Sequence, residues 1–157
     1  VSDLVPVLDS LLTWPGKPGA LGPLPALTAE ELARFDQGKV FFNAICAACH
    51  KEHGRGQDGL APPLVDSEYV IGPPGRLARI ALAGVHGPIE VQGVGYWLEM
   101  PPWGSLSDDQ LADILTYIRR AWGNRGTAIA PETIQRVRKE TANHPESWTA
   151  EELRRIH

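Results

Sequence analysis

The feature that most constrains this chain is the five-residue stretch Cys46-Ala47-Ala48-Cys49-His50. Two thiols separated by two small residues and followed directly by an imidazole are typical of three kinds of site. These are half of a zinc site, a redox-active dithiol, and the attachment point of a covalently held haem. Cys46 and Cys49 are the only cysteines among the 157 residues, so neither can form a disulfide with a cysteine elsewhere in the chain.

The rest of the sequence weakens the first two alternatives. A structural zinc site takes four ligands, usually including a second short-spaced Cys/His pair. The remaining histidines form no such pair: His53, His86, His144 and His157. A thioredoxin-like dithiol opens a helix that follows a strand, whereas this motif follows a predicted helix. The pattern therefore favours haem attachment, in which the two sulfurs add to vinyl groups and His50 supplies an imidazole to iron.

Composition limits the size of the fold and the class of partner. With 157 residues, 43% of them apolar, the chain is long enough for one domain with a core and too short for two large ones. The formal charge of -4 gives no basic excess of the kind that nucleic acid or an anionic membrane attracts. No apolar run could span a bilayer and no charged-then-apolar leader opens the chain at Val1, so we expect an excised domain or a removed leader.

Two capping boxes predict the main helices. Thr28 to Glu31 begins a helix that leads directly into Cys46, and Ser107 to Gln110 begins the strongest helical pattern, which ends at Gly123. The two apolar stripes are Leu32, Phe35, Phe42 and Ile45, and Leu111, Ile114, Leu115 and Ile118. Gly38 lies inside the first helix, where glycine costs about 1 kcal/mol relative to alanine, so either a second helix approaches closely there or the glycine is merely tolerated.

Between the motif and the second long helix, the pattern predicts a loop, a short helix and a ribbon. Residues 54–63 are rich in glycine, proline and polar residues, which predicts a long irregular loop. Pro73-Pro74 begins a short helix that ends at Gly84. Residues 89–94 alternate between apolar and polar residues, which predicts a short hairpin or extended ribbon.

Met100 is the only methionine in the chain and is followed by Pro101 and Pro102. The prolines stiffen the backbone and exclude a helix interior or a central strand. A lone methionine is usually core filler, but a stiff loop that presents a thioether among aromatics suits iron better. We therefore predict Met100 as the second axial ligand, with His86 as the runner-up.

On these residues, the chain from about Thr28 to Asn124 resembles the class I c-type cytochromes. The matching strings are Cys46–His50, Ala61–Leu64, Met100–Pro102 and Ile114–Ile118. The resemblance implies a mainly α cytochrome c fold of about four to five helices around one haem, with thioether bonds to Cys46 and Cys49 and with His50 and Met100 as metal ligands. It also implies that Gly38 and Phe42 cross the last helix near Tyr117. A further implication is that the Pro62 carbonyl accepts a hydrogen bond from Nδ1–H of His50.

Further cofactor-binding residues follow from this interpretation. Leu64, Ile80, Trp97 and Trp103 would wall the pocket and lower its dielectric. The candidates for contacts with the haem propionates are Arg79, Tyr96, Trp97 and Trp103, although plain core packing explains the aromatics equally well. Iron bound on both faces favours an electron carrier over an enzyme. The alternative is a haem enzyme or a gas or peroxide sensor in which Met100 is labile.

A narrower resemblance concerns partners. The strings Leu77–Leu82, Gly87–Ile89, Met100–Gly104 and Tyr117–Asn124 are similar to bacterial monohaem cytochrome domains that are subunits of, or fused to, quinoprotein sugar and alcohol dehydrogenases. This resemblance implies a dehydrogenase donor, an oxidase or another cytochrome as acceptor, and export to the periplasm. We expect a Pro/Gly-rich linker or wrapping arm at 1–27, the cytochrome domain at 28–124 and a helical extension at 125–157. The extension has helical patterns at 131–141 and 149–156, and the second begins with another capping box, Thr149 to Glu152.

Overall fold

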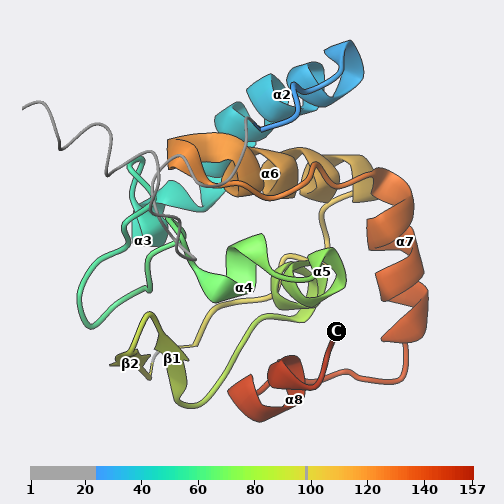
Figure 1. Ribbon diagram of the computed structural model, residues 1–157. Coiled ribbons are helices and arrows are strands. Elements are labelled where there is room, and N and C mark those ends of the chain that lie inside the picture. The colour runs from blue at the N-terminus through green and yellow to red at the C-terminus, as the bar shows by residue number, and fades with distance from the viewer. Residues whose placement is uncertain (1–23, 98) are drawn as a thin grey trace, which may run out of the picture.

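The computed structural model describes residues 24–97 and 99–157, so most of the predicted N-terminal arm lies outside the described residues. The described part of the chain is mainly helical with one small antiparallel sheet, as predicted (Figure 1). Its α-helices are α2 (Ala29–Ile45), α3 (Ala47–His50), α4 (Glu68–Ile71), α5 (Pro74–Ala83), α6 (Asp108–Arg120), α7 (Pro131–Glu140) and α8 (Ala150–Arg154). The strands are β1 (Ile89–Val91) and β2 (Val94–Tyr96), and a 3-10 turn, η1 (Ala121–Gly123), follows α6.

Both predicted capping boxes are present at the starts of the long helices. The Thr28 hydroxyl accepts from the Glu31 amide at 3.2 Å, and the Glu31 carboxylate accepts from the Thr28 amide at 2.8 Å. Ser107 and Gln110 make the same reciprocal pair, at 3.2 and 3.0 Å. Because each box satisfies two amides that the helix itself leaves without partners, α2 and α6 begin where the sequence predicts.

Helix α2 lies across α6, and this crossing is the largest helix contact in the described chain (Figure 1). Gly38 sits at the crossing, where a Cβ atom would overlap the main-chain carbonyl of Asp113 and lie 2.9 Å from Cβ of Tyr117. The close approach predicted at Gly38 is therefore confirmed. The predicted apolar stripe of α2 is only partly buried, because Leu32, in the first turn of the helix, is 50% exposed.

Aromatic rings fill the space beside this crossing. Phe42 is fully buried and packs against Tyr117 with ring centroids 5.4 Å apart, which confirms the predicted contact. Phe35 lies 5.1 Å from Tyr117, and Trp122 contacts both Phe42 and Tyr117 at 5.3 Å. Tilted and edge-on ring pairs of this kind add stabilisation beyond the buried area, so the crossing of α2 and α6 is closely packed next to the cysteine motif.

The segment between the cysteine motif and α6 contains the predicted short helix and hairpin, and one helix that the sequence analysis missed. Helix α5 ends at Gly84, whose φ of +76° is favourable only for glycine. The hairpin pairs Ile89 with Tyr96 and Val91 with Val94. The missed helix is α4, which Ser67 caps by accepting from the Tyr69 amide.

The C-terminal extension packs on the rest of the protein through two helices. In Figure 1, α7 runs along one side of the molecule and α8 turns back beneath α5. Ile134 and Val137 of α7 are fully buried in the core cluster that contains α6, whereas Leu153 of α8 is buried in a second cluster with the hairpin. No helix in the described ranges has the length and apolar character that crossing a bilayer would need.

Candidate functional site

A large apolar cavity opens between the cysteine motif, the 60–70 segment, α5 and the hairpin. The space free of protein atoms in the cavity, counted together with the open solvent at its mouth, is about 1310 Å³. Most of the residues predicted from the sequence line it: Cys46, Cys49, His50, Pro62, Leu64, Ile80, Tyr96, Met100 and Trp103. The fold therefore gathers into one space residues that come from widely separated parts of the chain.

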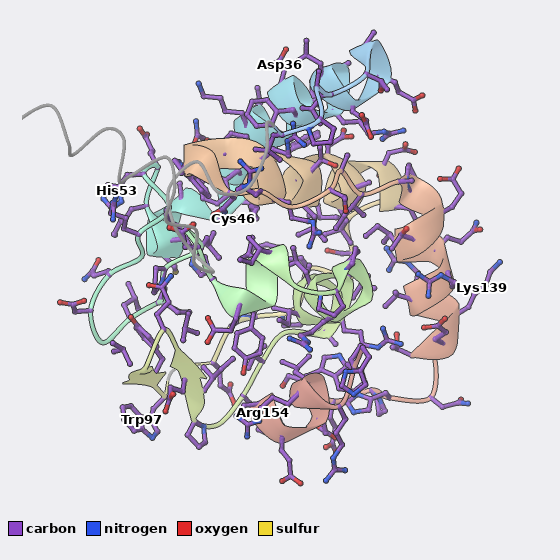
Figure 2. The ribbon with its side chains drawn as sticks, viewed as in Figure 1. Asp36, Cys46, His53, Trp97, Lys139 and Arg154 are labelled. Atoms are coloured by element: carbon purple, nitrogen blue, oxygen red, sulfur yellow. The ribbon has the colours of Figure 1, made fainter. Side chains whose placement is uncertain are left out.

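The cysteine motif lies where α2 gives way to a new short helix. Cys46 ends α2, and the amide of His50 donates to the Cys46 carbonyl at 3.0 Å, so one turn of α3 brings Cys46, Cys49 and His50 to the same side (Figure 2 labels Cys46). Burial, followed by the neighbouring Cys49 thiol, raises the pKa of the Cys46 thiol to about 11. This environment therefore disfavours the thiolate form of Cys46.

The imidazole of His50 has a fixed orientation. Its Nδ1 lies 3.0 Å from the carbonyl oxygen of Pro62, so the contact predicted between these residues is present. A carbonyl only accepts, so Nδ1 carries the proton and Nε2 keeps its lone pair. Burial lowers the pKa of His50, and the Pro62 contact opposes that shift. His50 is therefore a neutral imidazole whose Nε2 can act as a metal ligand.

The loop that carries Pro62 is held from α6 and η1 by residues that the sequence analysis missed. Asn124, fully buried, donates from Nδ2 to the carbonyls of Leu64 and Ile118 at 3.0 and 2.8 Å. Its Oδ1 accepts from the Asp66 amide at 2.7 Å, and Trp122 Nε1 donates to the Glu52 carbonyl at 3.0 Å. The only local signal was an asparagine after Gly123. This pattern predicts a helix end, but it does not predict hydrogen bonds to a distant loop.

Met100 lines the cavity from a segment that pairs with the end of α5. The Met100 amide donates to the Val85 carbonyl at 2.9 Å, and the Val85 amide donates to the Met100 carbonyl at 3.1 Å. Gly84 is required beside this pair, because a Cβ atom there would overlap the Met100 carbonyl. The Trp103 amide donates to the Ala81 carbonyl at 2.9 Å and fixes the loop after the two prolines.

Three residues considered in the sequence analysis lie away from the cavity lining. Arg79 donates to the Gly75 carbonyl at 3.0 Å and to the Glu140 carboxylate at 2.6 Å. Trp97 is 72% exposed at the outer edge of the hairpin, where Figure 2 labels it, because the register of β2 turns Tyr96 inward instead. The amide of His86 donates to the Trp148 carbonyl, and Val85, not His86, lines the cavity.

Further lining residues come from the elements that the sequence analysis described least. Tyr69 and Val70 belong to α4, and Leu77 and Val85 to α5 and its end. A capping serine at Ser67 followed by Glu68 was the available signal for α4. A helix of four residues has too little periodicity for its buried face to be predicted.

The chemistry of these groups fits a haem and does not fit a multidentate metal site. Two sulfurs at the edge, one oriented neutral imidazole and one thioether surround a large apolar space. In residues 24–97 and 99–157, no three histidine, cysteine, aspartate or glutamate side chains lie close enough together to hold an ion. A flat apolar macrocycle with covalent arms would fill this space, with His50 and Met100 as the nitrogen and sulfur donors.

Comparison with known proteins finds one matching family and several relatives. Residues 33–118 match the family described as cytochrome C oxidase, cbb3-type, subunit III. The chain is 35% identical over 114 residues to cytochrome c-552 of Thermus thermophilus, covering 69% of this chain and 76% of the relative.

Two further relatives are named as cytochrome subunits of dehydrogenases. The chain is 33% identical over 98 residues to the gluconate 2-dehydrogenase cytochrome c subunit of Pantoea cypripedii, covering 60% of this chain. It is 35% identical over 98 residues to the cytochrome c subunit of the quinone alcohol dehydrogenase of Gluconobacter oxydans, covering 59%. The matched region spans 22% and 20% of the lengths of these two subunits.

Proposed function

This chain belongs to the c-type cytochrome family, and from that membership we propose that it is an electron carrier with one covalently bound haem. Cys46 and Cys49 form the thioether bonds, and His50 through Nε2 and Met100 through sulfur hold the iron. Haem supplies reversible one-electron chemistry between ferric and ferrous iron. The observation that carries the proposal is the apolar cavity lined by both cysteines, His50 and Met100, with the His50 ring already oriented by Pro62.

The protein's own residues would tune this site in three ways. The Pro62 carbonyl holds Nδ1–H of His50 and makes the ring a more basic ligand. The apolar walls, among them Leu64, Ile80 and Trp103, exclude water and disfavour the more highly charged ferric form. A thioether ligand from Met100 would favour the ferrous form further. We expect a reduction potential higher than that of a bis-imidazole haem in the same cavity.

Fewer residues are proposed to contact the haem propionates than the sequence analysis predicted. Tyr96 and Trp103 remain candidates for propionate contacts, because both line the cavity. Arg79 is engaged with Glu140, and Trp97 lies at the surface, so a propionate contact from either would require a change in position. This proposal therefore assigns the propionate contacts to Tyr96 and Trp103.

The proposed electron donor is a dehydrogenase. Several relatives are named as cytochrome subunits of gluconate, alcohol and fructose dehydrogenases, each matched over about a fifth of its length. The proposed acceptor is an oxidase or another cytochrome. Covalent haem attachment in bacteria takes place outside the cytoplasm in this family, so we propose that the protein works in the periplasm or is otherwise exported.

Absorption spectra test the electron-carrier proposal. The reduced protein should show a sharp alpha band, the oxidised protein a near-infrared sulfur-to-iron band, and carbon monoxide should leave the reduced spectrum unchanged. A reversible one-electron redox titration should accompany these bands. Ready binding of carbon monoxide would favour the sensor or enzyme alternative, and the absence of a Soret band would reject haem altogether.

A further inference from the structure

Three chain segments form a short ladder beside the cavity. Val85 lies in the middle and pairs with Met100 on one side through two main-chain hydrogen bonds of 2.9 and 3.1 Å. On its other side it pairs with Trp148 of the C-terminal extension. The Trp148 amide donates to the Gly84 carbonyl at 3.0 Å, and the His86 amide donates to the Trp148 carbonyl at 3.0 Å. The extension thus lies one segment away from Met100.

The Trp148 side chain is held in place from three directions. Its ring stacks on His144 with centroids 3.8 Å apart and planes 9° apart, and the Arg79 guanidinium lies over it at 6.0 Å. It packs against the core cluster that contains Val85 and Leu153, as does Met100. Nε1 of Trp148 is buried without a hydrogen-bond partner in the described residues, so stacking and apolar packing are the contacts that hold the ring.

We propose that Trp148 is a positioning residue for Met100, and that its segment limits how often the Met100 sulfur leaves the iron. This rests on the proposed function, in which Met100 is the axial ligand. A two-stranded pair alone is marginally stable in water, whereas a third paired segment with an apolar face stabilises it. The Val85–Met100 pair has only two hydrogen bonds of its own. The Trp148 segment is the third segment of the ladder, and we expect it to stabilise this pair.

The consequence is a protein whose sixth ligand is controlled by the C-terminal extension. Ligand exchange requires the Met100 segment to move away from Val85, and such local opening has its own free energy, separate from global unfolding. Any partner or change that loosens the Trp148 segment would therefore open the iron to small ligands while the α2–α6 core stays folded.

The test compares Trp148→Ala, Trp148→Phe and a matched core variant, Ile134→Ala, in the full-length holoprotein. Ile134 is fully buried in the extension but belongs to the cluster around α6, so its loss destabilises the fold without touching the ladder. Two readouts are measured: carbon monoxide binding to the reduced protein and amide exchange at Val85 and Met100. Exchange is referred to the α6 amides of each variant, which removes the effect of global stability.

We expect Trp148→Ala to make carbon monoxide binding to the reduced protein detectable, because the ring's stacking and packing contacts no longer hold the segment. Amide exchange at Val85 and Met100 should become about tenfold faster, which corresponds to about 1.4 kcal/mol in the free energy of local opening. Trp148→Phe should restore most of the protection, because it keeps the stacked ring. Ile134→Ala should lower the melting temperature without a selective effect at Val85 and Met100. Should Trp148→Ala yield too little holoprotein, His144→Ala removes one face of the stack and should act in the same direction more weakly.

The proposal is overturned if Trp148→Ala matches wild type, or if it matches Ile134→Ala in both readouts. A different result would show that the proposed ligands, His50 and Met100, are wrong. In that case the wild-type protein itself would lack the sulfur-to-iron band and bind carbon monoxide readily. The amide exchange would still test whether Trp148 holds the Met100 segment, because it reports on the backbone.

Discussion

Gly38 of α2 faces the main-chain carbonyl of Asp113 of α6 so closely that no side chain fits between the two helices. Gly38→Val should therefore force the backbones apart. We expect a loss of about 3 kcal/mol in the free energy of unfolding, the upper part of the usual range for overpacking, because the opposing group is backbone and cannot rotate away. Urea denaturation of the holoprotein measures this loss.

Lys39→Val is the matched control for Gly38→Val. Lys39 is exposed on the same helix, so its replacement by valine should cost only helix propensity, less than about 0.7 kcal/mol. Equal midpoints for Gly38→Val and Lys39→Val would show that the close approach of α2 and α6 does not contribute to stability.

Covalent attachment through Cys46 and Cys49 gives the second prediction. The haem should stay with the polypeptide through denaturation and acid-acetone extraction, because thioether bonds do not depend on the fold. Met100→Ala is the control and should also keep its colour. Replacing both cysteines by alanine should yield little stable holoprotein, since the large apolar cavity then loses its anchored occupant. Full extraction of the colour from wild type would contradict the assignment.

The longer helices and the ligand candidates could be predicted from sequence because their signals are local. Capping boxes at Thr28, Ser107 and Thr149 each place a helix start within the chain, and all three are present. The cysteine motif and Met100 could likewise be identified as ligand candidates, because cysteine and methionine are rare in this chain and stand in distinctive local sequences. What a short pattern could not predict was which side of the hairpin faces inward, so both Tyr96 and Trp97 were expected in the pocket, and only Tyr96 lines it.

The long-range polar contacts could not be predicted for a different physical reason. Asn124 joins Leu64 to Ile118, and Arg79 pairs with Glu140, across separations that no periodicity encodes. The same holds for the pairing of Trp148 with Val85, which joins two segments with no strand pattern of their own. Residues of this kind decide how the loops sit around the cavity, and only the folded chain reveals them.

The capping box of α8 makes a pH-dependent contribution. Hydrogen bonds from the Thr149 amide and hydroxyl, at 2.8 and 2.7 Å, lower the pKa of Glu152 to about 2 from an ordinary value of 4.5, and His144 lies 3.5 Å away. A lowered folded-state pKa means that the stabilisation is present above about 4.5 and is lost as the pH falls towards 2. Stability against urea should therefore differ between wild type and Glu152→Gln most at neutral pH, and the difference should shrink across this window. A difference that stays constant from pH 7 to pH 2 would contradict it.

The last prediction concerns the proposed sulfur ligand. Met100→Ala should abolish the near-infrared sulfur-to-iron band of the oxidised protein, allow carbon monoxide to bind the reduced protein, and lower the reduction potential, because a thioether that favours ferrous iron has been lost. Met100→His should also lower the potential while it keeps six ligands and excludes carbon monoxide, so the pair separates the identity of the ligand from the loss of coordination. The fold should survive both changes, since the Val85–Met100 hydrogen bonds use only the main chain. If Met100→Ala keeps the wild-type spectrum, another residue is the ligand. His86, with its buried Nδ1 that has no partner in the described residues, is then the first to be replaced.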